Sequence, residues 1–169
     1  GQYVGDSAHA LVIDSPRPNT NSPPDRGQLP LVARGRYPGP MAEFVFDRPR
    51  KRDRKTIAEL LYTDMQSLGI PRAVEELLVV SDLLYEADPD RCFCRVVRPE
   101  RRGPAVGIVI ANVVISVKLA GKSVWLEHLY VHETWRGNGL GRALVGKVLD
   151  WAEDTGMGGV ELEAYPGKT

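Results

Sequence analysis

The chain has 169 residues, of which 43% are hydrophobic and 26% charged, a composition typical of one soluble globular domain. Lysine plus arginine and aspartate plus glutamate number 22 each, so no overall charge points to nucleic acid or an anionic membrane. No apolar run is long enough to span a membrane, and the first residues lack the pattern of a secretion signal. We therefore expect a cytoplasmic protein that acts neither on membranes nor on nucleic acid.

The first 40 residues differ from the rest of the chain. They hold seven prolines, separated by Asn, Ser and Gly and by short apolar pieces. Such a stretch orders poorly as helix or sheet and predicts an extended leader. The leader is either a native extension or a segment upstream of a natural start at Met41, and its composition fits both. Residues 41–169 are expected to form the folded domain.

From Met41 a short candidate strand at 43–46 is followed by a basic run from Arg48 to Lys55. Asp47 and Asp53 interrupt this run, which we interpret as a solvated loop. Apolar residues at helical spacing then predict a helix over 56–68, ended by Gly69, and a second helix from Pro71 toward Pro89.

The second half of the chain alternates strands with one regular helix. That helix runs from Leu140 through Ala152 and closes near Gly156. Cys92 and Cys94 lie two apart on a strand, so they share one face and are expected to be buried rather than to bind metal. Helices followed by strands predict an α+β or mixed α/β single domain. The predicted strands are 92–97, 106–117 (buried on both faces), 124–131 and 160–165.

A glycine-rich turn joins the 124–131 strand to this helix. Glycines at 137, 139 and 141 let a ligand approach the backbone N–H groups closely. The start of the helix adds unpaired N–H donors and the positive end of its dipole. Arg136 and Arg142 supply positive charge on either side. These features predict a site for a phosphate or pyrophosphate group.

Two common nucleotide loops do not fit this turn. The dinucleotide fingerprint requires a sixth-position glycine, but counting from Gly137 that position is Arg142. The P-loop requires Ser or Thr after its lysine, but Val148 follows Lys147. ATP-type and dinucleotide binding are therefore disfavoured.

The segment Arg136-Gly137-Asn138-Gly139-Leu140-Gly141 instead resembles the acyl-CoA loop, Arg/Gln-x-x-Gly-x-Gly/Ala, of the GNAT acyltransferases. The flanking strand and helix lie in register with that family, and the resemblance covers about residues 41–169. It implies a mostly antiparallel sheet with helices on both faces and a splayed pair of strands that holds acetyl-CoA. It also implies N-acetyl transfer, without a metal, to an amine of a small molecule or a protein.

The resemblance also implies roles for individual residues. Peptide groups of Leu129 and Val131 would pair with the pantetheine arm, and the Leu129 N–H would face the thioester carbonyl as an oxyanion donor. The pyrophosphate would lie on the N–H groups of Gly137, Asn138, Gly139, Leu140, Gly141 and Arg142.

Glu127 is the candidate general base, because polyamine acetyltransferases resemble this stretch and place their proposed base here, acting through water. A structural carboxylate paired with a nearby Lys or Arg is the alternative. His128 occupies the position where those relatives carry a substrate-binding acid.

The family continues with a further strand, a helix and a strand that usually supply a tyrosine acid, whereas this sequence stops at Thr169. The acid is therefore unassigned. The 160–165 strand would be a sheet edge, which attracts pairing. We expect it to be covered by further chain, by a second molecule in a homodimer, or by Leu11-Val12-Ile13 adding as a strand. A catalytically silent CoA-binding or interaction module is the alternative function.

Overall fold

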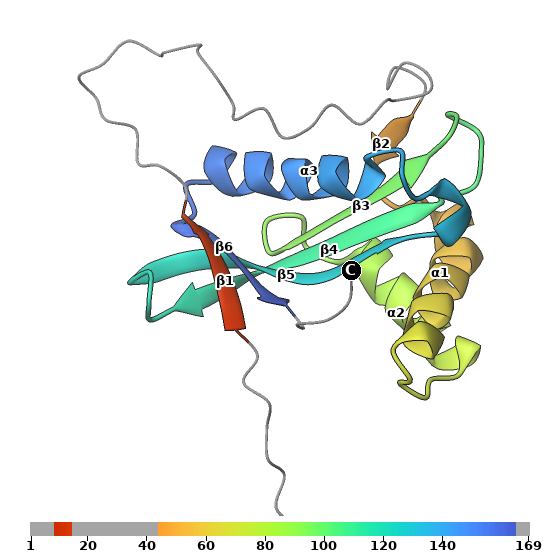
Figure 1. Cartoon of the computed structure of the whole chain (residues 1–169), viewed down its shortest axis with the longest axis horizontal. Coiled ribbons are helices and arrows are strands. Elements are labelled where there is room, and N and C mark those ends of the chain that lie inside the picture. The colour runs from red at the N-terminus through yellow and green to blue at the C-terminus, as the bar shows by residue number, and fades with distance from the viewer. Residues whose placement is uncertain (1–8, 15–43, 165–169) are drawn as a thin grey trace, which may run out of the picture.

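The computed structural model describes residues 9–14 and 44–164 (Figure 1). Within them, short 3-10 turns precede two of the helices, and strands occupy both ends of the described chain. In chain order the elements are β1 (His9–Asp14), β2 (Val45–Asp47), η2 (Lys51–Asp53), α1 (Arg54–Ser67), α2 (Val74–Glu86), β3 (Cys92–Arg98), β4 (Gly107–Ser116), β5 (Gly121–Val131), η3 (Glu133–Trp135), α3 (Leu140–Asp154) and β6 (Gly159–Ala164).

The strands form one twisted sheet in the order β1-β6-β5-β4-β3-β2. Neighbouring strands are antiparallel except β5 and β6, which are parallel and are joined by the crossover helix α3. Helix α3 lies on one face of the sheet, and α1 and α2 lie on the other, toward one end (Figure 1). The mixed α/β fold with a mostly antiparallel sheet, expected from the sequence, is confirmed.

Two apolar clusters hold the helices to the sheet, one on each face. On the α3 face, Leu140, Leu144, Val148 and Ala152 recur every three or four residues and pack against the inner strands. On the other face, Ile57, Leu60, Leu61 and Leu77 of α1 and α2 pack against β3 and β4. Each fully buried Leu, Ile or Val side chain contributes roughly 1.5–3 kcal/mol to the free energy of folding. Cys94 is buried in the second cluster, as predicted, whereas Cys92 is only partly buried against it.

Helix boundaries follow the glycine signals closely. Gly69 has φ +68 and Gly156 has φ +70, the left-handed conformation that ends α1 and α3 without steric strain. The second helix begins at Val74 and not at Pro71, because the Glu76 carboxylate accepts a hydrogen bond from the Ala73 N–H at 2.8 Å and fixes the first turn there.

The expectation that residues 106–117 are buried on both faces is wrong for the second half of that strand. Residues 107–111 of β4 are buried, but Ile115 is 86% exposed. The β4–β5 hairpin extends past the helices on the side away from α1 (Figure 1), so its tip has no covering layer. A run of Val and Ile signals strand propensity there, and burial depends on what packs against it.

The leader expected from the sequence contains an ordered strand. β1 pairs antiparallel with β6 along its whole length, from His9 opposite Ala164 to Asp14 opposite Gly159. Of the three covers expected for the 160–165 strand, the addition of Leu11-Val12-Ile13 is therefore the one that the structure shows. The boundary placed at residues 40 and 41 lies outside the described residues.

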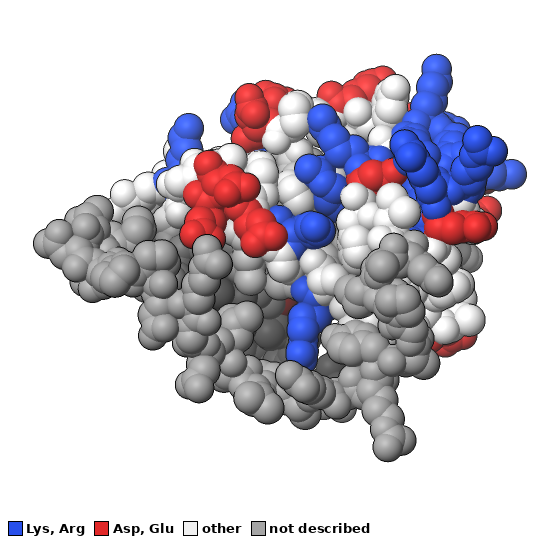
Figure 2. Space-filling model, turned by 90° about the horizontal axis from the view of Figure 1, so that it is seen from above, with Lys and Arg blue, Asp and Glu red and all other residues white. Residues whose placement is uncertain are grey.

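The basic run before α1 is only partly a solvated loop. Lys51 and Arg52 are exposed, and Figure 2 shows basic side chains gathered at the end of the molecule that holds β2 and η2. Asp53, however, is 3% exposed and lies against the fully buried Arg98 of β3. A buried guanidinium requires a charged partner, so Asp53 is turned inward out of the basic run.

Candidate functional site

The site is built where β5 and β6 part. Their parallel ladder has three residue pairs, from Val124 with Val160 to Leu126 with Leu162. At the base of this ladder, Ser123 Oγ donates to the buried Glu161 carboxylate at 2.6 Å, and this hydrogen bond lowers the pKa of Glu161. Beyond Leu126 the two strands diverge, as the splayed pair expected from the sequence requires.

A β-bulge lies at the point of divergence. Leu126 pairs with Ala111 and His128 pairs with Ile110, so Glu127 has no partner residue on β4. A bulge bends its strand and increases the local twist, which carries β5 away from β6. The candidate base therefore sits at the first residue of the open segment.

The backbone of the open segment has a defined orientation. The N–H of His132, which continues β5, donates to Val106 O at 2.8 Å on the β4 side. Peptide groups alternate along an antiparallel strand, so the N–H groups of Leu129 and Val131 point the other way, toward the edge that β6 has left. Leu129 is 37% exposed although β5 is an inner strand. The two predicted backbone donors therefore point toward the side that β6 has left, where Arg136 Nε donates to Val131 O.

The glycine-rich turn, residues 136–141, follows η3 and leads into α3. Gly137 has φ +83 and Gly139 φ +73, conformations that side chains disfavour, and Gly139 is the N-cap of α3. The first helical bond runs from the Ala143 N–H to Gly139 O at 3.0 Å. Within the described chain, none of the N–H groups of residues 137–142 has a hydrogen-bond acceptor. This row of donors at a helix N-terminus fits a pyrophosphate.

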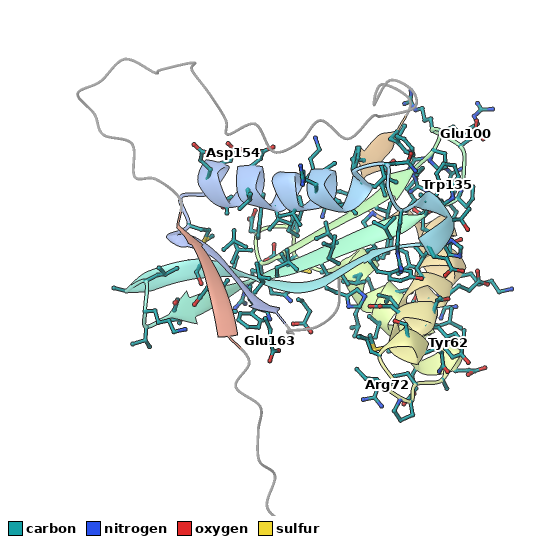
Figure 3. The ribbon with its side chains drawn as sticks, in the orientation of Figure 1. Tyr62, Arg72, Glu100, Trp135, Asp154 and Glu163 are labelled. Carbon is teal, nitrogen blue, oxygen red and sulfur yellow. The ribbon has the colours of Figure 1, made fainter. Side chains whose placement is uncertain are left out.

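Hydrogen bonds from two side chains hold the turn against η3 and the end of β5. Asn138 Nδ2 donates to Trp135 O at 2.9 Å, and a Cβ added at Gly141 would meet Val131 Cγ2 at 4.0 Å. Arg136 Nε donates to Val131 O at 2.9 Å, and its guanidinium lies 5.5 Å from the Tyr130 ring centre. Arg136 thus fixes the turn to the strand end, while Arg142 is exposed on the first turn of α3. Figure 3 shows Trp135 beside the start of α3 and Asp154 at its other end.

Glu127 itself is exposed. Among the described residues no Lys or Arg lies within ion-pair distance of its carboxylate, so the structure gives no support to the alternative of a paired structural carboxylate. The structure thus brings Glu127, Leu129, Val131 and the 136–142 turn together along one strand end and one helix start.

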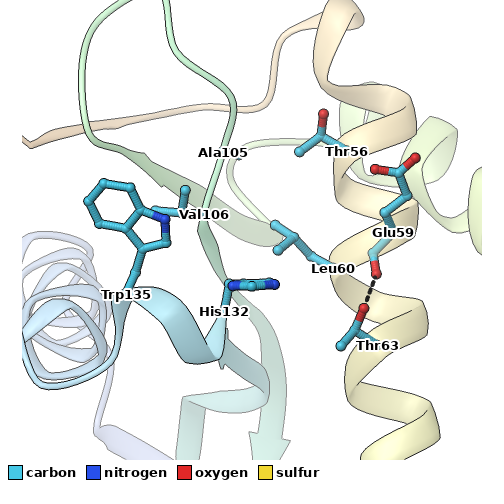
Figure 4. A pocket seen from close by; sticks show the side chains of 8 residues that line it. All are labelled: Thr56, Glu59, Leu60, Thr63, Ala105, Val106, His132 and Trp135. Carbon is cyan, nitrogen blue, oxygen red and sulfur yellow. Dashed lines mark hydrogen bonds between the residues drawn. The ribbon is translucent and has the colours of Figure 1, made fainter.

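Two features of this region are not predicted by the sequence. One is a hollow of about 360 Å³ between α1 and η3, drawn in Figure 4. Its walls include Glu59, Thr63, His132 and Trp135. The other is Asp64 of α1, whose carboxylate approaches His128. Both arise from the packing of α1 against the end of β5, which no local pattern specifies.

No cluster of three or more His, Cys, Asp or Glu side chains suitable for a metal occurs within residues 9–14 and 44–164. In the same residues, no helix combines the length and the apolar character needed to cross a membrane. Burial, with a smaller effect of the neighbouring Cys92, raises the pKa of the Cys94 thiol to about 12, so this cysteine is not a reactive thiolate.

The model of the acetyltransferase (GNAT) family matches residues 55–167, about two thirds of the chain. The chain belongs to the GNAT acetyltransferase family. This finding confirms the family resemblance of the 136–141 turn. No curated protein sequence matches the chain.

Solved structures similar to this GNAT chain share its fold at low identity. A possible acetyltransferase from Clostridium difficile 630 is 18% identical, with a TM-score of 0.62 over 74% of this chain and 82% of its own. Ribosomal-protein-alanine N-acetyltransferase from Brucella melitensis biovar Abortus 2308 is 23% identical, with a TM-score of 0.57 over 73% and 81%. A predicted acetyltransferase with acetyl-CoA from Clostridium acetobutylicum is 13% identical, with a TM-score of 0.57 over 73% and 82%.

Proposed function

We propose that this GNAT chain transfers the acetyl group of acetyl-CoA to an amine of a small molecule or a protein, by direct attack of the amine on the thioester. One observation carries the proposal. The N–H donors at residues 137–142, which have no acceptor among the described residues, follow along the chain from the outward-facing N–H groups of Leu129 and Val131. A ligand that has a pyrophosphate at one end of an extended amide-bearing arm matches both sets of donors.

The pyrophosphate would bind at the turn, where Gly137 and Gly139 leave the peptide groups uncovered. Arg142 adds a positive charge at the same helix start. The pantetheine arm would then lie along β5 as a short added strand, since its amides can pair with the edge that faces away from β4.

Catalysis would use two groups of β5. The Leu129 N–H is fixed by the strand and can stabilise the negative charge that develops on the thioester oxygen. Glu127 lies two residues earlier and can take the proton from the incoming ammonium, directly or through water. The amine nitrogen then bonds to the carbonyl carbon as the C–S bond breaks, and the departing CoA thiolate takes the second proton from the acylated nitrogen.

An acetyltransfer assay with thiol detection over a panel of primary amines tests this proposal. We expect acetyl-CoA-dependent thiol release with at least one amine, together with a product heavier by one acetyl group in mass spectrometry. Tight binding of CoA without transfer to any amine would instead indicate the silent binding module.

A further inference from the structure

Two carboxylates beside the basic run of the sequence are turned away from the surface. Asp47 Oδ1 lies 3.1 Å from Arg98 Nε, and Asp53 Oδ2 lies 2.6 Å from Arg98 Nη2. Arg98 is fully buried, and a buried guanidinium requires charged partners. The acidic residues that interrupt the basic run therefore compensate a charge inside the protein, and most of the cations of the run are left at the surface.

A turn distant in sequence adds further cations. Arg50 Nη1 and Arg52 Nη2 both donate to Arg101 O, at 3.4 and 3.2 Å, and Arg98 Nη1 donates to Gly103 O of the same turn at 3.3 Å. These hydrogen bonds hold the turn beside η2. The resulting basic patch lies at the end of the molecule where Figure 2 shows basic side chains gathered, and consists of Arg50, Lys51, Arg52, Arg101 and Arg102.

The basic patch carries little compensating charge. Of its five members, only Arg50 has an ion-pair partner among the described residues, namely Asp47. The other four members are exposed. Guanidinium groups present a planar fork of donors that matches a carboxylate. The whole chain has no net charge, so this local excess attracts an anionic partner at short range.

An apolar hollow adjoins the basic patch. Its volume is about 640 Å³, and its walls include Val45, Pro99, Pro104 and Trp135. Arg101 belongs both to these walls and to the basic patch. Figure 3 shows Trp135 at the same end of the molecule as Glu100 of the turn. An apolar side chain can enter such a hollow while the neighbouring arginines bind carboxylates.

The surroundings of the basic patch favour a short acidic protein segment over a nucleic acid. Glu100 is exposed in the turn itself, and Glu133 is exposed in η3, two residues before Trp135. A phosphate backbone that continued past the patch would meet these like charges. Domains that bind nucleic acid typically have a pI above about 9, whereas the pI of this chain is about 7.0.

We propose that the basic patch and the adjoining hollow form a docking surface for an acidic segment of a partner protein. Carboxylates of the segment bind the exposed arginines, and one apolar side chain of the segment enters the hollow beside Trp135. Arg101 belongs to both parts, so an acidic residue and the apolar residue of the partner lie next to each other in its sequence. This surface goes beyond the proposed acetyl transfer and does not depend on it.

An amide NMR titration of the full chain with a synthetic peptide tests the proposal. The peptide acetyl-Glu-Asp-Glu-Phe-Glu-Asp-Glu-amide has no amine and therefore cannot act as an acetyl acceptor. We expect saturable shifts at Arg101, Arg102 and the Trp135 indole N–H, with an affinity that falls as sodium chloride is raised from about 0.05 M to about 0.5 M. A peptide with Gln and Asn in place of its acidic residues should not bind. Replacing its Phe by Ala should weaken binding at least about threefold.

Charge reversal tests the location of the surface. Arg101→Glu combined with Arg102→Glu should weaken peptide binding at least about tenfold, because two attractive contacts become repulsive. Arg72→Glu combined with Arg91→Glu is the matched control, since both arginines are exposed and lie away from the basic patch. Figure 3 shows Arg72 far from Glu100, and Arg91 precedes β3 at the strand end opposite Arg98. Circular dichroism should show the same melting temperature for both double variants as for the wild type.

Four results would each overturn the proposal. The first is the absence of saturable shifts in the wild type, and the second is equal peptide affinity in the two double variants. The third is tighter binding of a single-stranded oligothymidylate of about ten nucleotides at the same amides, because the surface would then recognise phosphates. The fourth is displacement of the peptide by acetyl-CoA, which would assign the basic patch to the cofactor.

Discussion

Arg98 of β3 and Asp53 of η2 form a buried ion pair, with Arg98 Nη2 2.6 Å from Asp53 Oδ2 and Arg98 Nη1 2.7 Å from Asp53 Oδ1. Removing Asp53 leaves the fully buried Arg98 with the partly buried Asp47 as its remaining carboxylate partner among the described residues, through Nε at 3.1 Å. Asp53→Asn should therefore lower the free energy of unfolding by up to about 3–5 kcal/mol, measured by urea denaturation. Asp82→Asn, which breaks the exposed pair with Arg54, is the control and should change it little. Equal losses in the two variants would contradict this account.

The same pair predicts how stability depends on pH. Burial alone would raise the pKa of Asp53, but hydrogen bonds from Arg98 and the Arg50 N–H, with the charges of Arg98 and Arg52, lower it overall. A carboxyl whose pKa is lowered by folding stabilises the protein above its unfolded pKa, near pH 4. That contribution is lost as the pH falls through the folded pKa. Urea midpoints below about pH 4 should fall less steeply in Asp53→Asn than in the wild type.

Glu127 is the residue on which proton removal depends in the proposed mechanism. Glu127→Gln keeps the shape of the side chain and removes the base, so kcat with a good amine acceptor should fall on the order of a hundredfold or more at neutral pH. Affinity for CoA, measured by calorimetry, should stay the same. Glu153→Gln, an exposed change on the last turn of α3, serves as the control. Unchanged turnover in Glu127→Gln would remove this residue from the mechanism.

The pairing of β1 with β6 predicts the behaviour of a shortened chain. All six residues of β6 pair with a residue of β1 in the sheet, but only three of them pair with a residue of β5. Deleting residues 1–14 leaves one edge of β6 unpaired, which favours association between molecules. Light scattering should then show species larger than the monomer, whereas deletion of residues 1–8 alone should not produce them. A monomeric 15–169 chain with unchanged thermal stability would show that β1 does not protect this edge.

The elements that sequence reasoning located correctly are those with local signals. Leu140, Leu144 and Val148 set the face of α3, and the glycines at 137 and 139 marked the turn before it. Ile115 was wrongly expected to be buried, because Val and Ile favour strands whether or not a helix covers them. The local sequence around Asp53 predicts a solvated loop, because the partner that draws Asp53 inward, Arg98, is 45 residues away.

The finer geometry of the candidate site also depends on contacts distant in sequence. The bulge at Glu127 is a property of the register between β4 and β5, so the strand pattern alone does not show it. The approach of Asp64 to His128 depends on how α1 packs on β5. By contrast, the backbone roles expected of Leu129 and Val131 stay predictions, and the outward orientation of their N–H groups supports them.

The central claim is that the turn before α3 binds the pyrophosphate of acetyl-CoA. Gly139 has φ +73, so Gly139→Val forces a β-branched residue into the left-handed region and places a side chain near the phosphate position. Gly146→Ala lies within α3 with nothing within 4 Å of the added carbon and is the matched control. A folded Gly139→Val variant, checked by circular dichroism, should lose CoA affinity while Gly146→Ala retains it.

Calorimetric titration of the full chain with acetyl-CoA, and separately with ATP, is the most direct measurement. The account predicts saturable binding of acetyl-CoA at one site per chain, weakened at least about tenfold in Gly139→Val, with no comparable binding of ATP. Binding of ATP without any response to acetyl-CoA, or equal acetyl-CoA affinity in the wild type and Gly139→Val, would contradict it.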